Sequence, residues 1–107
     1  MEKTRLELLL EIVQTKPDDA FARYGLAMEL SGSGDPAQAW QHFDYLLAHH
    51  PDYSPAYYHA GKLLASLGRR EEAQKVLTKG IEVTTRQGNL HAQSELQAAL
   101  EQLMGEP

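Results

Sequence analysis

The sequence predicts an all-α protein built from about six antiparallel helices, and three observations lead to that prediction. Apolar residues recur at helical spacing through most of the 107 residues, and no segment alternates apolar and polar residues as a strand would. Prolines and most glycines fall between the helical segments. A pattern of large and small residues also occurs twice, and several of its positions are separated by 34 residues.

The first two predicted helices are separated by a proline. The predicted helices cover about residues 3–15, 18–31, 35–49, 54–66, 69–86 and 89–104. An apolar stripe with helical spacing marks the first of them, and Pro17 follows its end. The stripe comprises Leu6, Leu9, Leu10 and Val13. Asp18 is in position to cap the second helix.

A polar residue followed by proline marks the start of the third and fourth helices. Asp35-Pro36 places a capping residue before a proline at the first helical position, and Gln38 follows three residues after the cap. Ser54-Pro55 repeats the arrangement for the fourth helix. The third helix must end before Pro51, because the residue before a proline disfavours the helical conformation.

The fifth and sixth helices are separated by Gly88, which is expected to end the fifth in the left-handed conformation. Asn89 can then cap the sixth helix. The sixth helix has one apolar stripe and an otherwise polar surface, as expected for the soluble end of a helical stack. The stripe comprises Ala92, Leu96, Ala99, Leu100 and Leu103.

The repeated pattern places small residues in neighbouring helices. Gly25 and Gly61 lie in the first helix of each pair, and Ala39 and Ala73 lie in the second, so that two helices can approach closely. The first copy comprises Phe21, Gly25, Met28, Gly34, Ala39, Phe43, Leu47 and Pro51. The second copy comprises Tyr57, Gly61, Leu64, Gly68, Ala73, Leu77, Ile81 and Thr85.

The large aromatic residues at pattern positions are expected to fill the grooves beside these close contacts. Phe21 and Tyr24 would do so in the first helix of the first pair. Trp40, Phe43 and Tyr57 also occupy core positions of the pattern, so we interpret them as buried packing rather than as an aromatic binding surface.

The twofold pattern resembles the tetratricopeptide repeat over about residues 17–87. The resemblance implies a single domain folded as a right-handed α-solenoid. Its expected parts are an N-terminal half-repeat helix, two repeats and a C-terminal capping helix, covering residues 1–16, 17–51, 52–87 and 88–107. It also implies a protein-binding adaptor or scaffold without catalytic activity, whose partner is a protein or a peptide.

Composition and motifs give no support for the other classes of function. The absence of cysteine excludes disulfides and thiolate zinc sites and favours a reducing compartment, the cytoplasm. No glycine-rich phosphate loop is present, and the five histidines show no HxxxH spacing. Ten basic and 15 acidic residues give a net charge of −5, which repels phosphates. The run at residues 8–10 is too short to span a membrane. We therefore expect no enzyme activity, cofactor, metal, nucleic acid or membrane.

The resemblance also implies that the first helix of each pair lines a concave wall. The candidate peptide-binding residues on this wall are Arg23, Leu26, Tyr58, His59 and Lys62. The best-known peptide-binding members use Lys and Asn here to clamp a C-terminal carboxylate. This sequence has Ala22 and Leu26 at the matching points of the second helix, so that clamp is absent. The alternative interpretation is a concave wall that is merely solvated.

The first helix has a second apolar face, formed by Leu8 and Ile12. These side chains point roughly away from the main stripe, toward the slot where a preceding helix would sit. Because the ends of solenoids are normally polar, this face predicts weak homodimerisation through Leu8 and Ile12. The alternative is that the two residues are singly exposed and shielded by the stems of Arg5 and Glu11.

Overall fold

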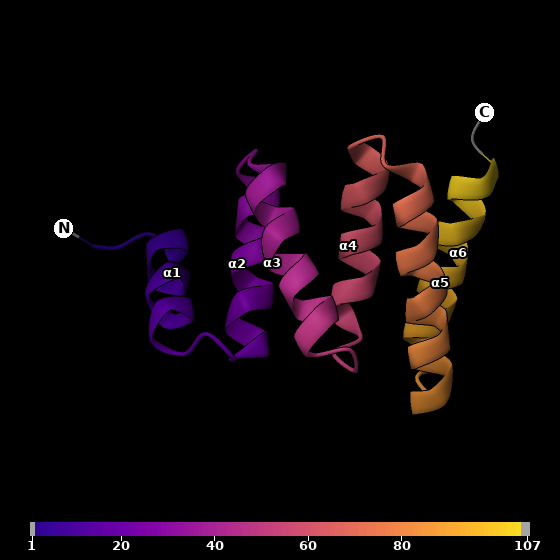
Figure 1. Ribbon diagram of the computed structural model, residues 1–107, viewed down its shortest axis with the longest axis horizontal. Helices are drawn as coiled ribbons and strands as arrows, with labels where there is room; N and C mark the ends of the chain where they lie inside the picture. The colour runs from indigo at the N-terminus through magenta and orange to yellow at the C-terminus, as the bar shows by residue number, and fades with distance from the viewer. Residues whose placement is uncertain (1, 106–107) are drawn as a thin grey trace. The chain divides into compact units, whose positions relative to one another are not determined.

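A computed structural model describes residues 2–105 of the chain and contains six helices (Figure 1). They are α1 (Arg5–Thr15), α2 (Ala20–Gly32), α3 (Pro36–His49), α4 (Pro55–Ser66), α5 (Arg70–Gln87) and α6 (Leu90–Gly105). No strand occurs within the described residues. The prediction of an all-α fold with about six helices is confirmed. Every helix also begins and ends close to its expected limits.

Most helix ends follow the local signals in the sequence. Asp35 caps α3, because its Oδ1 accepts a hydrogen bond from the backbone N–H of Gln38 at 3.2 Å. Asn89 caps α6 in the same way through the N–H of Ala92, at 3.1 Å. Gly88 ends α5 with a φ of 69°, which is the left-handed conformation expected of it.

Two predicted caps were wrong. Asp19, not Asp18, caps α2, and its Oδ1 accepts a hydrogen bond from the N–H of Ala22 at 3.0 Å. Adjacent acidic residues carry the same capping signal, so only the path of the chain into the helix selects between them. Ser54 precedes Pro55 as expected, but its backbone is already helical and its side chain makes no capping hydrogen bond within the described residues.

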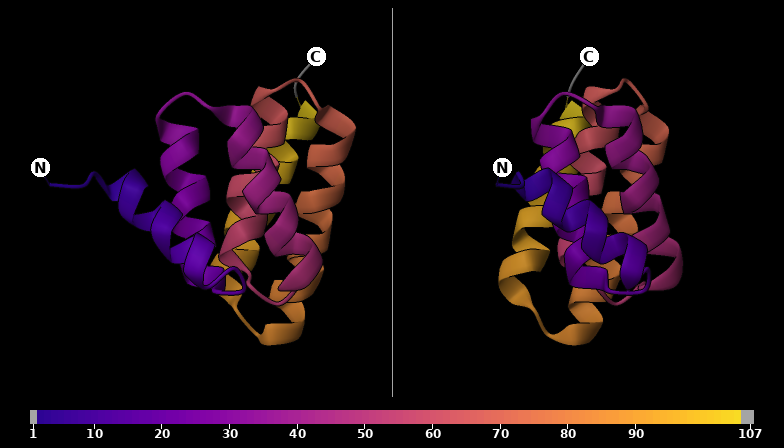
Figure 2. Two further views of the ribbon diagram at one scale, coloured as in Figure 1. Left: turned by 60° about the vertical axis from the view of Figure 1, so that its left-hand side comes forward. Right: turned by 90° about the vertical axis from the view of Figure 1, so that its left-hand side faces the viewer.

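The helices pack into two compact units, of which the first ends at His50 and the second begins at Pro51. In the first unit α2 packs against both α1 and α3. In the second unit α5 packs against α4 and α6, and α4 also contacts α6. Figure 2 shows α1 beside α2 and α5 beside α6 from two further directions.

Each unit has its own apolar core. The core of the first unit comprises Val13, Ala22, Leu26, Ala27, Leu30, Ala39, Phe43 and Leu46. The core of the second comprises Ala56, Tyr57, Ala60, Leu63, Leu64, Ala73, Leu77, Val83, Leu96 and Leu103. Alanines recur in both cores because small side chains allow neighbouring helices to approach closely.

The glycines within helices mark close contacts, but not all of them with the expected helix. A Cβ atom at Gly61 would lie 2.6 Å from Leu77 Cγ, which confirms that α4 and α5 touch at this glycine. A Cβ atom at Gly25 would instead lie 3.2 Å from Leu9 Cδ2. Gly25 therefore faces α1, not the following helix α3 with which the pattern had paired it.

One aromatic residue of the pattern is on the surface. The Phe21 side chain is 76% exposed, whereas its counterpart Tyr57 is 2% exposed, so the prediction that Phe21 fills a core groove was wrong. Tyr57 packs where Gly80 leaves room, since a Cβ atom there would lie 2.6 Å from Tyr57 Cβ. The residue 34 positions before Gly80 is Leu46, which is not a glycine and whose side chain is fully buried.

The other aromatic predictions have mixed outcomes. Phe43 is fully buried and meets the Tyr24 ring edge to face, with 6.4 Å between the ring centroids. Trp40, which was expected to be buried, is only partly buried. A tryptophan in a small two-layer unit rarely finds enough neighbours to cover its whole ring.

Candidate functional site

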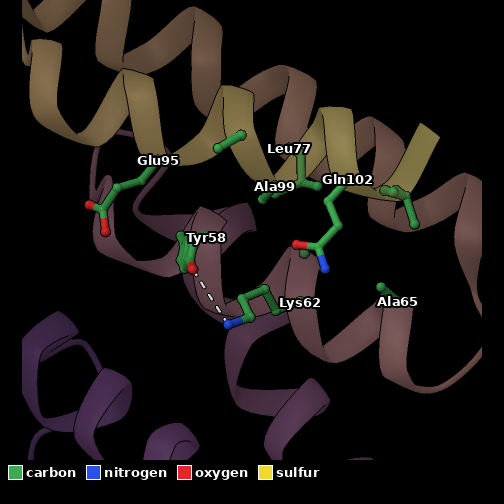
Figure 3. Close-up of a pocket in the computed structure, with 10 residues that line it drawn as sticks. Tyr58, Lys62, Ala65, Leu77, Glu95, Ala99 and Gln102 are labelled. Carbon is green, nitrogen blue, oxygen red and sulfur yellow. Dashed lines mark hydrogen bonds between the residues drawn. The ribbon is translucent and has the colours of Figure 1, made fainter. Parts of the chain in front are cut away.

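A hollow lies in the second unit, between α4 and α6 (Figure 3). It encloses about 320 Å³. We call it the α4–α6 groove, and it is lined by Tyr58, Gly61, Lys62, Ala65, Leu77, Glu95, Ala98, Ala99, Gln102 and Leu103. These residues come from three helices, so the groove exists only when the unit is folded.

Helical spacing determines which residues face the groove. On α4, Tyr58, Lys62 and Ala65 follow one another at i, i+4 and i+7 and therefore share one face. On α6, Glu95, Ala99 and Gln102 have the same spacing, so they form the opposite wall. Figure 3 shows these two sets of side chains on the two helices. Seven residues of helix rise give the groove a length of roughly 10 Å.

The groove is apolar at its floor because of a glycine. Gly61 has no side chain, and Leu77 from α5 occupies the vacated space with 2% of its surface exposed. Leu103 adds a second buried apolar side chain. A side chain larger than hydrogen at position 61 would displace Leu77, so this glycine positions the floor.

The groove adjoins a second, more polar hollow, and we call the two together the apolar half and the polar half of the α4–α6 groove. The second hollow shares three lining residues with the groove, namely Tyr58, Lys62 and Glu95. Its other lining residues are Ser54, Pro55, His59, Asn89, Ala92 and Leu96. These residues lie toward the N-terminal ends of α4 and α6, whereas the alanines of the groove lie toward the C-terminal ends.

Lys62 stands where the two halves meet. Its Nζ donates a hydrogen bond of 3.4 Å to the Tyr58 hydroxyl and lies 5.1 Å from the centroid of the Tyr58 ring. Such a long hydrogen bond is weak, so a better acceptor can displace it. A cation near an aromatic face is also attracted to the ring by about 0.5–1 kcal/mol at exposed sites.

His59 lies next to this cation. Its ring meets the Tyr58 ring edge to face, with 5.2 Å between centroids. Burial lowers the pKa of His59 below its ordinary value of 6.5, the positive charge of Lys62 lowers it further, and the Glu95 carboxylate opposes the shift. The neutral imidazole is therefore favoured at neutral pH, and Lys62 is the cation that the polar half offers.

Three of the five predicted wall residues come together, and two lie in the other unit. Tyr58, His59 and Lys62 line the hollows just described. Leu26 is fully buried in the core of the first unit, and Arg23 is 9% exposed. Neither of these side chains offers a surface for a ligand, so neither belongs to the candidate site.

Arg23 holds the first unit together. Its guanidinium lies 3.7 Å from the centroid of the Tyr45 ring and donates a hydrogen bond of 2.6 Å to the carbonyl oxygen of Pro17. A second nitrogen is 3.1 Å from His42 Nδ1. Burial lowers the pKa of His42, and the adjacent positive charge of Arg23 lowers it further. Arg23 thus links the α1–α2 connection to α3.

Sequence reasoning missed the wall of the groove that α6 contributes. Glu95, Ala99 and Gln102 of this helix line the groove, and none of them was among the predicted wall residues. Their i, i+4, i+7 spacing matches that of the α4 wall and was a usable signal. The floor residue Leu77 was recognised only as a core residue.

A second candidate surface lies on α1. This helix packs onto α2 through Val13 and Leu9, and Arg5 forms an ion pair of 3.0 Å with Glu29. Leu8 and Ile12 are 48% and 40% exposed. The apolar surface of α1 is therefore wider than its contact with α2.

The described residues 2–105 contain no group of three or more histidine, aspartate or glutamate side chains arranged to hold a metal ion. Over the same residues, no helix combines the length and apolar character that crossing a membrane would require.

Comparison with known proteins places this geometry in context. A family model described as tetratricopeptide repeat matches residues 30–103. A tetratricopeptide repeat domain protein from Salinibacter ruber, known from a solution NMR structure, is 37% identical. The match covers 86% of this chain and 93% of that one, with a TM-score of 0.82. A crystal structure of a tetratricopeptide repeat domain protein from the same organism is 38% identical, with 81% and 98% coverage and a TM-score of 0.78.

More distant similarity extends to the fold alone. A protein from Bordetella parapertussis, known from a solution structure, is 24% identical over 96% of this chain and 90% of that one, with a TM-score of 0.81. No curated protein matches the chain. With six helices and no strand in residues 2–105, the match to the Salinibacter structures confirms the predicted all-α helical-repeat solenoid class.

Proposed function

Because this chain belongs to the tetratricopeptide repeat family, we propose that it is a non-catalytic adaptor or scaffold that binds a segment of another protein in the α4–α6 groove. Tetratricopeptide repeats generally mediate protein–protein interaction. Our proposal adds the binding face to that general role. The absence of cysteine from the sequence supports a reducing compartment, so we place this function in the cytoplasm.

The observation that carries the proposal is the division of the groove into an apolar floor and a polar rim. Leu77 and Leu103 form the floor, and Tyr58 and Lys62 stand at the rim. Clefts with apolar linings and a few polar groups are the usual form of binding sites, since burial provides free energy and the polar groups provide orientation. A groove between helices also accepts an extended or helical peptide without rearrangement.

The test compares proteins captured from the source cell by the wild type and by the variant Tyr58→Ala/Lys62→Ala. Each of these anchors is expected to contribute about 1 kcal/mol or more to binding, so the double variant should lose most of its partner. The matched control is Gln74→Ala/Lys75→Ala, which removes two exposed side chains of α5 that do not line the groove. A partner retained equally by all three proteins would place the binding face elsewhere.

A second candidate function is self-assembly through α1, and the exposure of Leu8 and Ile12 favours it. Fully burying such side chains is worth about 1.5–3 kcal/mol each, which is enough for weak association of two copies. A symmetric dimer would bury the same face of both copies. The two candidate functions are compatible with each other, because one uses a surface of the first unit and the other a groove of the second.

Sedimentation velocity at high micromolar concentration tests the second candidate. We expect a concentration-dependent dimer that Leu8→Glu/Ile12→Lys abolishes. The control variant Gln14→Glu/Thr15→Lys introduces the same charges at exposed positions of the same helix. A wild-type protein that stays monomeric, or a dimer that both variants leave intact, would refute this candidate.

A further inference from the structure

We propose the chemical class of the segment that the α4–α6 groove recognises: one aliphatic side chain with a carboxylate two to four residues away along the chain. This inference rests on the proposed function and makes it more specific. The aliphatic side chain enters the apolar half of the groove, and the carboxylate binds Lys62.

The apolar half favours an aliphatic side chain. Its walls are Ala65 on α4 and Ala98 and Ala99 on α6, and its floor is made by Leu77 and Leu103. The floor is apolar, and the Gln102 amide is a polar group on the α6 wall, so an entering side chain meets no hydrogen-bonding group at the floor and gains there by burial. A polar side chain would lose its hydration at the floor without finding a partner there.

The polar half favours a carboxylate because Lys62 lacks one. Lys62 forms no ion pair with any residue in the described range 2–105, although the chain carries 15 acidic residues. Five of the other nine basic side chains do form ion pairs, among them Lys3 with Glu11, Arg5 with Glu29 and Arg86 with Asp52; Lys62 differs from the remaining unpaired ones in lining the groove. The Lys62 ammonium group is held by the weak hydrogen bond to the Tyr58 hydroxyl and by its attraction to the Tyr58 ring, and neither neutralises its charge, so an incoming carboxylate meets an available cation.

Glu95 limits where the carboxylate can lie. It stands on the opposite wall, 3.4 Å from His91 Nε2 on its own helix. In Figure 3 Tyr58 lies between the Glu95 carboxylate and the Lys62 ammonium group. An acidic side chain is therefore attracted to the α4 wall and repelled from the α6 wall, which gives the bound segment one orientation across the groove.

The spacing of the two groups follows from the helix geometry of α4. Lys62 and Ala65 are three residues apart, which corresponds to about 4.5 Å of helix rise. Side chains on one face of an extended segment repeat every second residue, roughly 6.6 Å apart. On a bound helix the same neighbours would be three or four residues apart. Either conformation gives a separation of two to four residues.

Selection from a phage-displayed library of random 12-residue peptides tests the inference on the full chain. With wild-type protein we expect enriched peptides to share an aliphatic residue and an acidic residue at that separation. Replacing the aliphatic residue of a selected peptide by serine should weaken binding about tenfold or more, and replacing the acidic residue by its amide about two- to fivefold.

Two variants assign these preferences to the groove. Lys62→Glu should replace the acidic preference by a basic one, while Lys75→Glu, the same charge change on the exposed surface of α5, should not. Ala98→Trp should block the apolar half, and Gln97→Trp, one residue along on exposed α6 surface outside the groove, should not. Circular dichroism melts establish that all four variants remain folded.

The outcomes separate this inference from the proposed function. Both the inference and the proposed function are supported if three results hold. The selected peptides are enriched in aliphatic and acidic residues, Lys62→Glu reverses the charge preference, and Ala98→Trp abolishes binding. If Ala98→Trp abolishes peptide binding but the selected peptides show no acidic preference, or keep it with Lys62→Glu, the inference is overturned. The groove would still be the binding face. Peptides that bind all variants equally, or no enrichment at all, overturn both.

Discussion

The contact between Gly61 and Leu77 gives the sharpest test of how the second unit is packed. A Cβ atom at Gly61 would lie 2.6 Å from Leu77 Cγ and closer still to Cδ2. Such distances are well inside van der Waals contact. Because Cγ is the branch point of the leucine and not its flexible end, Leu77 cannot escape by a small rotation, and α4 and α5 must separate.

The substitution Gly61→Ala therefore has two effects on stability that oppose each other, and the typical size of each is known. Alanine is favoured over glycine in a helix by about 1 kcal/mol. Overpacking a close contact costs about 1–3 kcal/mol, and the severity of this clash places the cost at the upper end of that range. We expect a net loss of about 1–2 kcal/mol, against a total stability of about 5–15 kcal/mol. Gly61→Leu should lose more.

Thermal unfolding followed by circular dichroism measures the effect. A loss of about 1–2 kcal/mol should lower the Tm by about 4–16 °C for a domain of this size. Gly25→Ala is the matched control, because the nearest atoms to a Cβ there are the flexible ends of the Leu9 side chain, at 3.2 Å, and of the Arg5 side chain, at 3.7 Å. That variant should melt within a few degrees of the wild type, or above it.

A second comparison isolates the clash itself. In a Leu77→Ala background the obstructing atoms are gone, so Gly61→Ala should become stabilising by about 1 kcal/mol. If Gly61→Ala has an unchanged or raised Tm in the wild-type background, α4 and α5 do not meet closely at this glycine. The account of the groove floor would then fail with it.

Three further predictions concern other parts of the chain. Phe21→Ser should change stability by less than about 0.5 kcal/mol because its ring is exposed, whereas Tyr57→Ala should cost about 3–5 kcal/mol, and urea unfolding of the two variants measures the contrast. Because the pKa of His42 is lower in the folded chain than in the unfolded chain, the unfolded chain binds the proton more readily as the pH falls below 6.5. The stability from neutral His42 is therefore complete above pH 6.5 and falls below it, and His42→Gln should reduce this pH dependence in melts at pH 5 and 8. Replacing Arg23 by Ala should destabilise the first unit by about 1–3 kcal/mol, since it removes the hydrogen bond to the carbonyl oxygen of Pro17 and the cation beside the ring of Tyr45; a melt equal to that of the wild type would contradict this role.

The sequence by itself determined the number, type and approximate limits of the helices. These depend on neighbouring residues, such as the Asp35-Pro36 start of α3 and the Gly88 end of α5, and local signals act in the same way wherever the helix is placed. The repeat pattern also indicated the family, because a period of 34 residues is specific to few architectures. Three residues of the candidate site, Tyr58, His59 and Lys62, were proposed from the family resemblance together with their helical phase on α4.

Only the tertiary structure decided what each pattern position contacts. Gly25 and Gly61 occupy equivalent positions, yet one faces α1 and the other faces α5. Phe21 and Tyr57 are likewise equivalent, but Gly80 on another helix leaves room for the Tyr57 ring, whereas Phe21 stays 76% exposed. Burial depends on the volume that distant side chains leave free, and no local pattern contains that information. The α4–α6 groove has the same origin, because its floor is a leucine of α5 that reaches the space left by a glycine of α4.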